Sequence, residues 1–317
     1  MPGFWSYLGF SEKEEPKNEN ADENLMKPDV NHELAVDLLR ITMLVYNYGK
    51  NLIIKEDTTI ESFVSEIQTG GGIDSLDMND TRKEALSEIA QHVPSGKICK
   101  WISDEDTDLQ VGVTLSEGKK RVCVVFRGSE SKSDWYYDFM IVKEGLTVDA
   151  LTKSPLVNVH GGFLSQLMTN DVYSSLVATV KSLLVDHPDY EVCVTGHSLG
   201  GALSTLFGFM ISHELDNKVT VTSFASPRVG DWGWKKAFEA KSNLYHYRVT
   251  NQRDAITAVP MINYYHVGNN IQLKDDKFEL FPLDCVRGWF DETLFTCWSA
   301  SEHNVDLYYK RLIKNLW

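Results

Sequence analysis

A serine between two glycines, in the run Gly196-His197-Ser198-Leu199-Gly200, is the pattern in this chain that most directly suggests chemistry. A β-branched run at 192–195 leads into it, and an amphipathic stretch at 202–210 leads out. A strand, a sharp turn and a helix in that order expose a nucleophilic serine at a helix N-terminus, where developing negative charge is favoured. The glycines remove side chains that would collide in such a turn. We therefore predict that Ser198 is a catalytic nucleophile.

A serine hydroxyl needs a general base, and the expected partners are a histidine and a carboxylate that follow it in the order Ser, Asp, His. Asp254 comes just after a predicted strand, where open sheets of this type place their sites. Its rival Asp231 precedes Trp-Gly and is more typical of a helix N-cap. His303 opens the last predicted helix, whereas His266 follows Asp254 too closely. The sequence therefore predicts a triad of Ser198, Asp254 and His303.

Acyl transfer through such a triad also needs hydrogen-bond donors for the oxyanion, and loss of one donor typically costs about 10²-fold in rate or more. The backbone N–H of Leu199 is the first predicted donor, because it follows the nucleophile at the start of a helix. Ser129 is the second, since it follows the strand-like run 121–126 and the flexible Gly128. We expect its N–H, with or without its hydroxyl, to face the site.

The elements that must position these residues alternate between strands and helices. The expected helices are 31–49, 81–92, 163–185, 200–213 and 305–316, and the expected strands are 111–115, 121–126, 190–195, 219–224, 245–249 and 271–273. This alternation predicts an α/β fold with a mostly parallel central sheet and helices on both faces. Residues 1–30 are polar and predict a flexible arm, and 31–317 predict a single domain.

Composition excludes several classes of function. The 317 residues include 43% hydrophobic residues, so the chain can form a sizeable core, and a net charge of −14 makes nucleic acid an unsuitable partner. The start has no basic leader, no apolar run approaches the roughly 18 residues of a membrane span, and we expect a cytoplasmic protein.

Cysteine usage fits the same expectation of a reducing compartment. The five cysteines have no metal-ligand spacing, and no metal or cofactor is expected; they are Cys99, Cys123, Cys193, Cys285 and Cys297. Cys123 and Cys193 fall inside apolar runs, where a free thiol acts as a small hydrophobe. Whether Cys285 pairs with Cys297 is open, as is the oligomeric state.

Five motifs in family order make the chain resemble the class 3, or fungal-type, triacylglycerol lipases of the α/β-hydrolase superfamily. They are VFRGS at 125–129, VHGGF at 159–163, VTGHSLGGA at 194–202, FASPRVGD at 224–231 and RVTN at 248–251 followed by Asp254. The resemblance covers the chain from about residue 34 onward. It implies an esterase acting on acylglycerols, phospholipids or related esters, with Ser198, Asp254 and His303 as triad and Ser129 and Leu199 as oxyanion donors.

Two segments depart from the family pattern. Residues 130–134, after the oxyanion serine, are polar until three aromatics at 135–137, whereas the family's lipases carry a short amphipathic lid there. Activation at a lipid surface is therefore in doubt. The aromatic-rich segment 274–299 fits an acyl pocket, a second cover and plain core equally well.

The leading interpretation is an acylglycerol lipase that makes transient contact with lipid surfaces. A phospholipase A1 or an esterase for soluble aryl or short-chain esters shares every catalytic residue and stays open as the alternative. A non-catalytic lipase-like binding protein is disfavoured, because a scaffold has no need of a complete triad.

Overall fold

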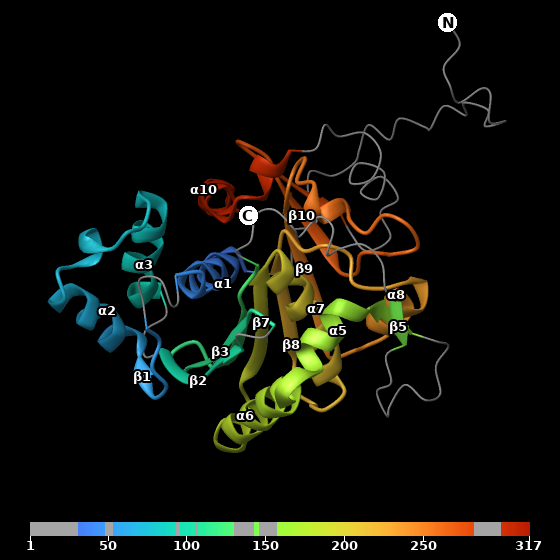
Figure 1. Ribbon diagram of the computed structural model, residues 1–317, viewed down its shortest axis with the longest axis horizontal. Helices are drawn as coiled ribbons and strands as arrows, with labels where there is room; N and C mark the ends of the chain where they lie inside the picture. Colours follow the sequence, from blue (N-terminus) through green and yellow to red (C-terminus); the bar gives the residue numbers. More distant parts are fainter. Residues whose placement is uncertain are drawn as a thin grey trace, which may run out of the picture.

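A nine-stranded sheet runs through the protein (Figure 1). The computed structural model describes residues 31–47, 53–92, 96–104, 107–129, 143–145, 157–281 and 299–317. In spatial order the strands are β1 (Thr58–Thr59), β2 (Gly96–Asp104), β3 (Leu109–Ser116), β4 (Arg121–Phe126), β7 (Glu191–His197), β8 (Val219–Phe224), β9 (Leu244–Asn251), β10 (Asn269–Leu273) and β11 (Phe278–Phe281). A separate pair joins β5 (Lys143–Gly145) to β6 (Asn158–His160).

The centre of the sheet is parallel and its flanks are antiparallel. Strands β4, β7, β8, β9 and β10 pair in parallel, while β1, β2 and β3 on one side and β11 on the other pair antiparallel. Strands β3 and β4 form an antiparallel hairpin. The predicted α/β-hydrolase class is confirmed, with a central parallel block inside a mixed sheet.

Helices cover both faces of the sheet, as predicted. One face carries α1 (His32–Val45), α2 (Ile60–Thr69), α3 (Asp80–His92) and α10 (Val305–Lys314), and the other carries α5 (Gly161–Met168), α6 (Val172–Asp186), α7 (Leu199–Ser212) and α8 (Trp232–Glu239). Short 3-10 turns lie at Ile73–Ser75, Thr169–Asp171, Ile256–Ala258 and Ala300–His303. Within the described ranges, no helix is both long and apolar enough to cross a bilayer.

The central strands are apolar on both sides, and side chains at successive positions pack against helices on opposite faces of the sheet. In β4, Val122 and Val124 pack with the α6 and α7 layer, whereas Cys123 packs with α1 and α10. Cys123 lies directly across from Cys193 of β7 in the register. Both thiols are free and buried, and burial raises the pKa of Cys123 to about 12. They act as small apolar side chains, as expected.

The predicted single helix over 163–185 is wrong, because it is two helices. α5 ends at Met168 and α6 begins at Val172, and between them Asn170 and Asp171 have φ values of 50° and 57°. These are left-handed conformations that Asn and Asp tolerate better than most residues. The break lets α5 and α6 cover different parts of the same sheet face.

The first and last described helices pack against each other. His32 Nε2 donates to the backbone oxygen of Leu312 at 2.8 Å, and Arg40 Nε donates to the Tyr309 hydroxyl at 3.1 Å. His32 also meets the Trp317 ring edge-on, with ring centres 4.7 Å apart. α10 is therefore held by α1 as well as by the sheet, which matters because His303 lies just before α10.

A buried ion pair ties α1 to the sheet, and breaking it should be costly. Arg121 Nη2 lies 2.9 Å from Asp37 Oδ2, with the two side chains 8% and 1% exposed. Asp37→Ala is expected to lower the free energy of unfolding by about 3 kcal/mol, because the buried guanidinium loses its carboxylate. In the exposed pair Lys120–Asp189, the change Asp189→Ala is expected to cost far less, because solvent screens that pair. Urea denaturation measures both, and equal losses would contradict the prediction.

Candidate active site

Ser198 sits at a strained turn between a strand and a helix. β7 ends at His197 and α7 begins at Leu199, and Ser198 between them has φ 59° and ψ −125°, a conformation that a side chain strongly disfavours. Its N–H donates to the Phe224 carbonyl of β8 at 3.0 Å, which holds the turn in place. Strain at one residue that the surrounding sheet maintains is a frequent mark of a functional position.

Three glycines allow the end of β4 to lie directly against this turn. A Cβ on Gly200 would overlap the Phe126 carbonyl and approach the backbone of Arg127 to 2.8 Å, and one on Gly196 would approach the Phe126 carbonyl to the same distance. A Cβ on Gly128 would overlap the Tyr46 hydroxyl of the chain after α1. Any side chain at these positions would push the two segments apart. Ser129, the residue after Gly128, is thereby held beside the nucleophile turn.

The structure brings Ser198, His303 and Asp254 into one hydrogen-bonded line. His303 Nε2 lies 2.8 Å from Ser198 Oγ, and His303 Nδ1 lies 2.9 Å from Asp254 Oδ2 and 3.0 Å from Asp254 Oδ1. Asp254 is fully buried behind the histidine, whose side chain is 12% exposed. With Nδ1–H donating to the carboxylate, Nε2 is left to accept the serine proton.

Tyr308 supports Asp254 and was not predicted from the sequence. Its hydroxyl donates to Asp254 Oδ2 at 2.7 Å and accepts the N–H of Asn251 at 2.8 Å. Burial and the neighbouring Asp254 charge hold the pKa of Tyr308 well above its usual range, so the phenol keeps its proton. The N–H of Ile256 donates to Asp254 Oδ1 at 2.9 Å. Both carboxylate oxygens are thus fixed by the protein as well as by His303.

His197 links the nucleophile turn to the backbone of the catalytic histidine. Its Nε2–H donates to the His303 carbonyl at 2.9 Å, and its Nδ1 accepts the Tyr46 hydroxyl at 2.9 Å. Burial, followed by the proximity of His303, holds the pKa of His197 well below its usual range, which keeps the ring neutral. A neutral ring with Nε2–H suits both contacts. His197 therefore positions His303.

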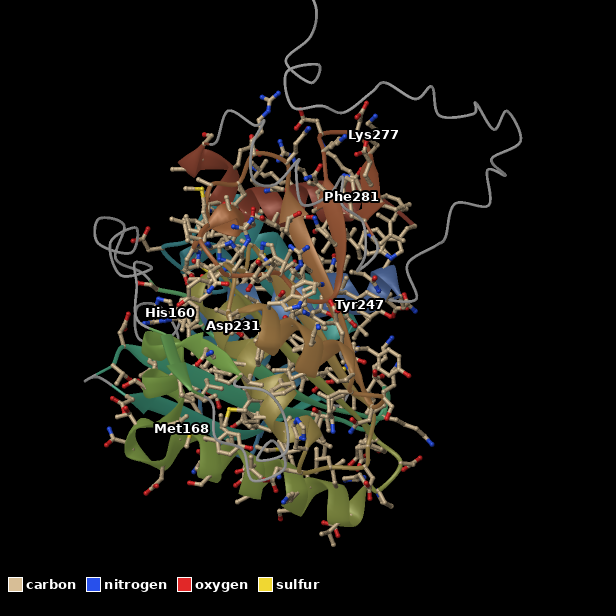
Figure 2. All side chains as sticks on the ribbon, turned by 90° about the vertical axis from the view of Figure 1, so that its right-hand side faces the viewer. His160, Met168, Asp231, Tyr247, Lys277 and Phe281 are labelled. Carbon is tan, nitrogen blue, oxygen red and sulfur yellow. The ribbon has the colours of Figure 1, made fainter. Side chains whose placement is uncertain are left out.

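The two rival residues lie in other environments. Asp231 is the N-cap of α8, where its Oδ1 accepts the Trp234 N–H at 3.0 Å, as its N-cap interpretation predicted. Figure 2 shows it beside His160 in the strand pairing that joins 157–160 to 229–231. His266 Nε2 donates to the Thr257 carbonyl at 2.6 Å and is not joined to Ser198 by any described contact.

Both expected oxyanion donors lie within the described residues. Leu199 is the first residue of α7, and the N–H groups of a helix's first turn have no partner within the helix. Ser129 is partly buried at the end of the segment that the glycine contacts hold against the turn. The polar segment 130–134 lies outside the described residues, as does most of 274–299. Among the parts of the chain described, no three His, Cys, Asp or Glu side chains are grouped as metal ligands.

Replacing Tyr308 by phenylalanine tests the support of Asp254. Loss of this buried, charge-assisted bond is expected to lower kcat for ester hydrolysis roughly tenfold, which corresponds to about 1.4 kcal/mol, with KM little changed. Tyr309→Phe is the matched control, since Tyr309 is equally buried but its hydroxyl meets Arg40. Steady-state kinetics of both variants check this, and equal losses would mean that Tyr308 acts only through packing.

Sequence comparison finds lipase relatives for the part of the chain that holds the site. A family model described as lipase (class 3) matches residues 123–264. Phospholipase A1-II 4 of Oryza sativa subsp. japonica is 34% identical over 169 residues, covering 48% of this chain and 43% of that protein. A lipase of Rhizomucor miehei is 30% identical over 189 residues, covering 58% of this chain and 50% of that protein. The chain thus spans about half the length of these relatives.

Comparison with solved structures shows a similar fold over more of the chain. A lipase from Rhizopus microsporus var. chinensis is 26% identical with a TM-score of 0.57, covering 68% of this chain and 76% of that one. The triacylglyceride lipase of Rhizomucor miehei aligns with a TM-score of 0.63 over 88% of this chain and 96% of that one, at 20% identity. The second likeness bears on the fold alone.

Proposed function

Because residues 123–264 match the class 3 lipase family model, we propose that the chain is a carboxylic ester hydrolase of that family that cleaves acyl esters of lipids with Ser198 as nucleophile. The observation that carries the proposal is the hydrogen-bonded line from Ser198 through His303 to Asp254, built on a strained turn. A buried carboxylate, an imidazole and a strained serine at a helix N-terminus suit nucleophilic acyl transfer.

The proposed reaction has two halves. In the first, His303 Nε2 takes the Ser198 proton as Oγ attacks the ester carbonyl, and the N–H groups of Leu199 and Ser129 stabilise the oxyanion. The intermediate collapses as the alcohol leaves with the proton from His303, which leaves an acyl group on Ser198. In the second half, His303 activates water, which attacks the acyl-enzyme and releases the carboxylic acid.

The head group of the substrate separates the two candidate activities. The relatives include proteins named lipase and phospholipase A1, so triacylglycerol and phospholipid are both reasonable substrates. Three substrates would decide between these activities: dissolved p-nitrophenyl esters of increasing chain length, a triacylglycerol emulsion, and phosphatidylcholine vesicles. For the two lipids, the release of fatty acid is measured. Hydrolysis of the dissolved esters alone would indicate a soluble-ester esterase. If the protein hydrolysed none of these substrates and a fluorophosphonate did not label Ser198, the proposal would be contradicted.

Domain organisation and location form part of the same proposal. A single domain over 31–317 is supported by the contacts of α1 and α10 with each other and with one sheet. The predicted arm, 1–30, lies outside the described residues. Free thiols at Cys99, Cys123 and Cys193 support a reducing compartment such as the cytoplasm.

A further inference from the structure

Exposed apolar side chains lie at the start of α8 and in the loop that follows the turn of Asp254, and we call them together the rim surface. It consists of Trp232, Lys236, Met261, Ile262 and Tyr265. Trp232, Met261 and Ile262 are 49%, 47% and 86% exposed. The Trp232 ring meets the Tyr265 ring edge-on with centres 5.3 Å apart, and Lys236 Nζ lies 5.5 Å from the centre of the Trp232 ring. Two aromatics and a lysine therefore contact one another, and two exposed apolar side chains precede Tyr265 by three and four residues in the same loop.

The rim surface lies at the same edge of the sheet as Ser198. Strands β8 and β9 run parallel to β7, so they end where β7 delivers the nucleophile. Trp232 opens α8, the helix after β8, and Met261 and Ile262 follow β9 and the turn that carries Asp254. Figure 2 shows Asp231, the residue before Trp232, well above Met168 at the end of α5.

Backbone pairing fixes the two halves of the rim surface to each other. Gly230 bridges both Val159 and Tyr265, and the Tyr265 N–H donates to the Gly230 carbonyl at 2.8 Å. The Arg228 N–H donates to the Val259 carbonyl at 2.8 Å, next to the loop that carries Met261. The backbone on either side of Met261 and Ile262 is thus tied by hydrogen bonds to the segment that leads into α8.

We propose that the rim surface docks the protein on a phospholipid surface, an inference that rests on the proposed hydrolysis of lipid esters. Trp and Tyr rings favour the head-group level of a bilayer, and a lysine beside them places its ammonium among lipid phosphates. Ile262 and Met261, at the tip of their loop, enter the acyl boundary. With a net charge of −14 on the chain, a cation here complements phosphate where most of the protein would repel it.

Vesicle binding by the inactive Ser198→Ala protein tests this docking without consuming the lipid. The probe is phosphatidylcholine vesicles, and cosedimentation measures the partition coefficient. Adding Ile262→Glu is expected to lower the partition coefficient at least tenfold, because a carboxylate replaces an inserted apolar side chain. The matched control is Val185→Glu, where the side chain is 78% exposed near the end of α6, at the opposite edge of the parallel strands. The control is expected to change binding less than twofold.

The outcomes separate docking from catalysis. With Ser198 intact, Ile262→Glu is expected to hydrolyse a dissolved short-chain ester within twofold of the parent. If the parent binds vesicles through this surface but hydrolyses no ester, the proposed function fails and the docking stands. Unchanged binding in Ile262→Glu, or an equal loss in Val185→Glu, overturns the docking. So does a concentration-dependent dimer that Ile262→Glu dissociates in analytical ultracentrifugation while vesicle binding stays the same, because the surface is then a protein interface.

Discussion

Ser198→Ala is expected to lower kcat/KM for ester hydrolysis by about 10⁴- to 10⁶-fold, because no other group can form the acyl-enzyme. The far-ultraviolet circular dichroism spectrum and the unfolding midpoint should stay close to those of the parent, since the hydroxyl's described partner is His303 alone. Hydrolysis of a dissolved p-nitrophenyl ester measures the loss. Turnover near the parent rate would mean that Ser198 is not the nucleophile.

Combining Ser198→Ala with His303→Ala tests whether the two residues act as one unit. Groups that act as one unit lose their effect together, so the double variant is expected to be no more than a few-fold slower than Ser198→Ala. Asp254→Asn should also lose most activity, because it removes the carboxylate that orients His303 Nδ1–H. The matched controls are Asp231→Asn and His266→Ala. A larger loss in either control than in His303→Ala would show that the triad is assigned to the wrong residues.

Lowering the pH from 6.5 to 5.5 is expected to destabilise the fold by up to about 3 kcal/mol, through three buried histidines. Burial is the main cause that holds the pKa values of His197, His246 and His266 well below the usual range, with nearby positive charge from Arg248 adding to the effect at His246 and His266. In the unfolded chain each imidazole binds a proton below about pH 6.5, whereas in the folded protein it stays neutral. The unfolded state therefore binds more protons, and stability falls as the pH falls, by up to about 1.4 kcal/mol per pH unit for each histidine.

The slope of unfolding free energy against pH checks this directly. His246→Gln is expected to reduce the slope by up to about 1.4 kcal/mol per pH unit, whatever it does to stability at pH 7.5. Its amide can still reach Ser223, whose hydroxyl lies 2.9 Å from His246 Nε2. An unchanged slope in His246→Gln would contradict the prediction.

Local sequence patterns predicted the part of the site that one continuous segment forms, which is the turn that carries Ser198. The β-branched run before Gly196 and the amphipathic stretch after Gly200 are β7 and α7, and the turn between them is strained at Ser198 as a nucleophile turn requires. Asp254 and His303 were placed by chain order and strand ends. The structure brings them to Ser198, while their catalytic roles remain the subject of the variants above.

What the sequence did not reveal depends on contacts between distant segments or on single backbone angles. Tyr308 reaches Asp254 only after α10 packs on the sheet, 54 residues away along the chain, and no local pattern signals that bond. The apolar spacing of 163–185 continues through Asn170, so the left-handed break was invisible. α2 was missed although its signal was present, since Ile60, Phe63, Val64 and Ile67 recur at helical spacing after the N-cap Thr59.

The packing of α1 on α10 also sets the order in which the site can form during synthesis. His32 and Leu312 lie 280 residues apart, so at roughly 5–20 residues per second α1 waits about 15–55 s for the helix that covers it. The strand, turn and helix around Ser198 can form in that interval, but His303 follows Ser198 by 105 residues. The nucleophile is therefore built long before its base, and the nascent chain carries an inert serine until α10 docks. Contacts of such long range also slow folding, because the loop must close before they stabilise anything.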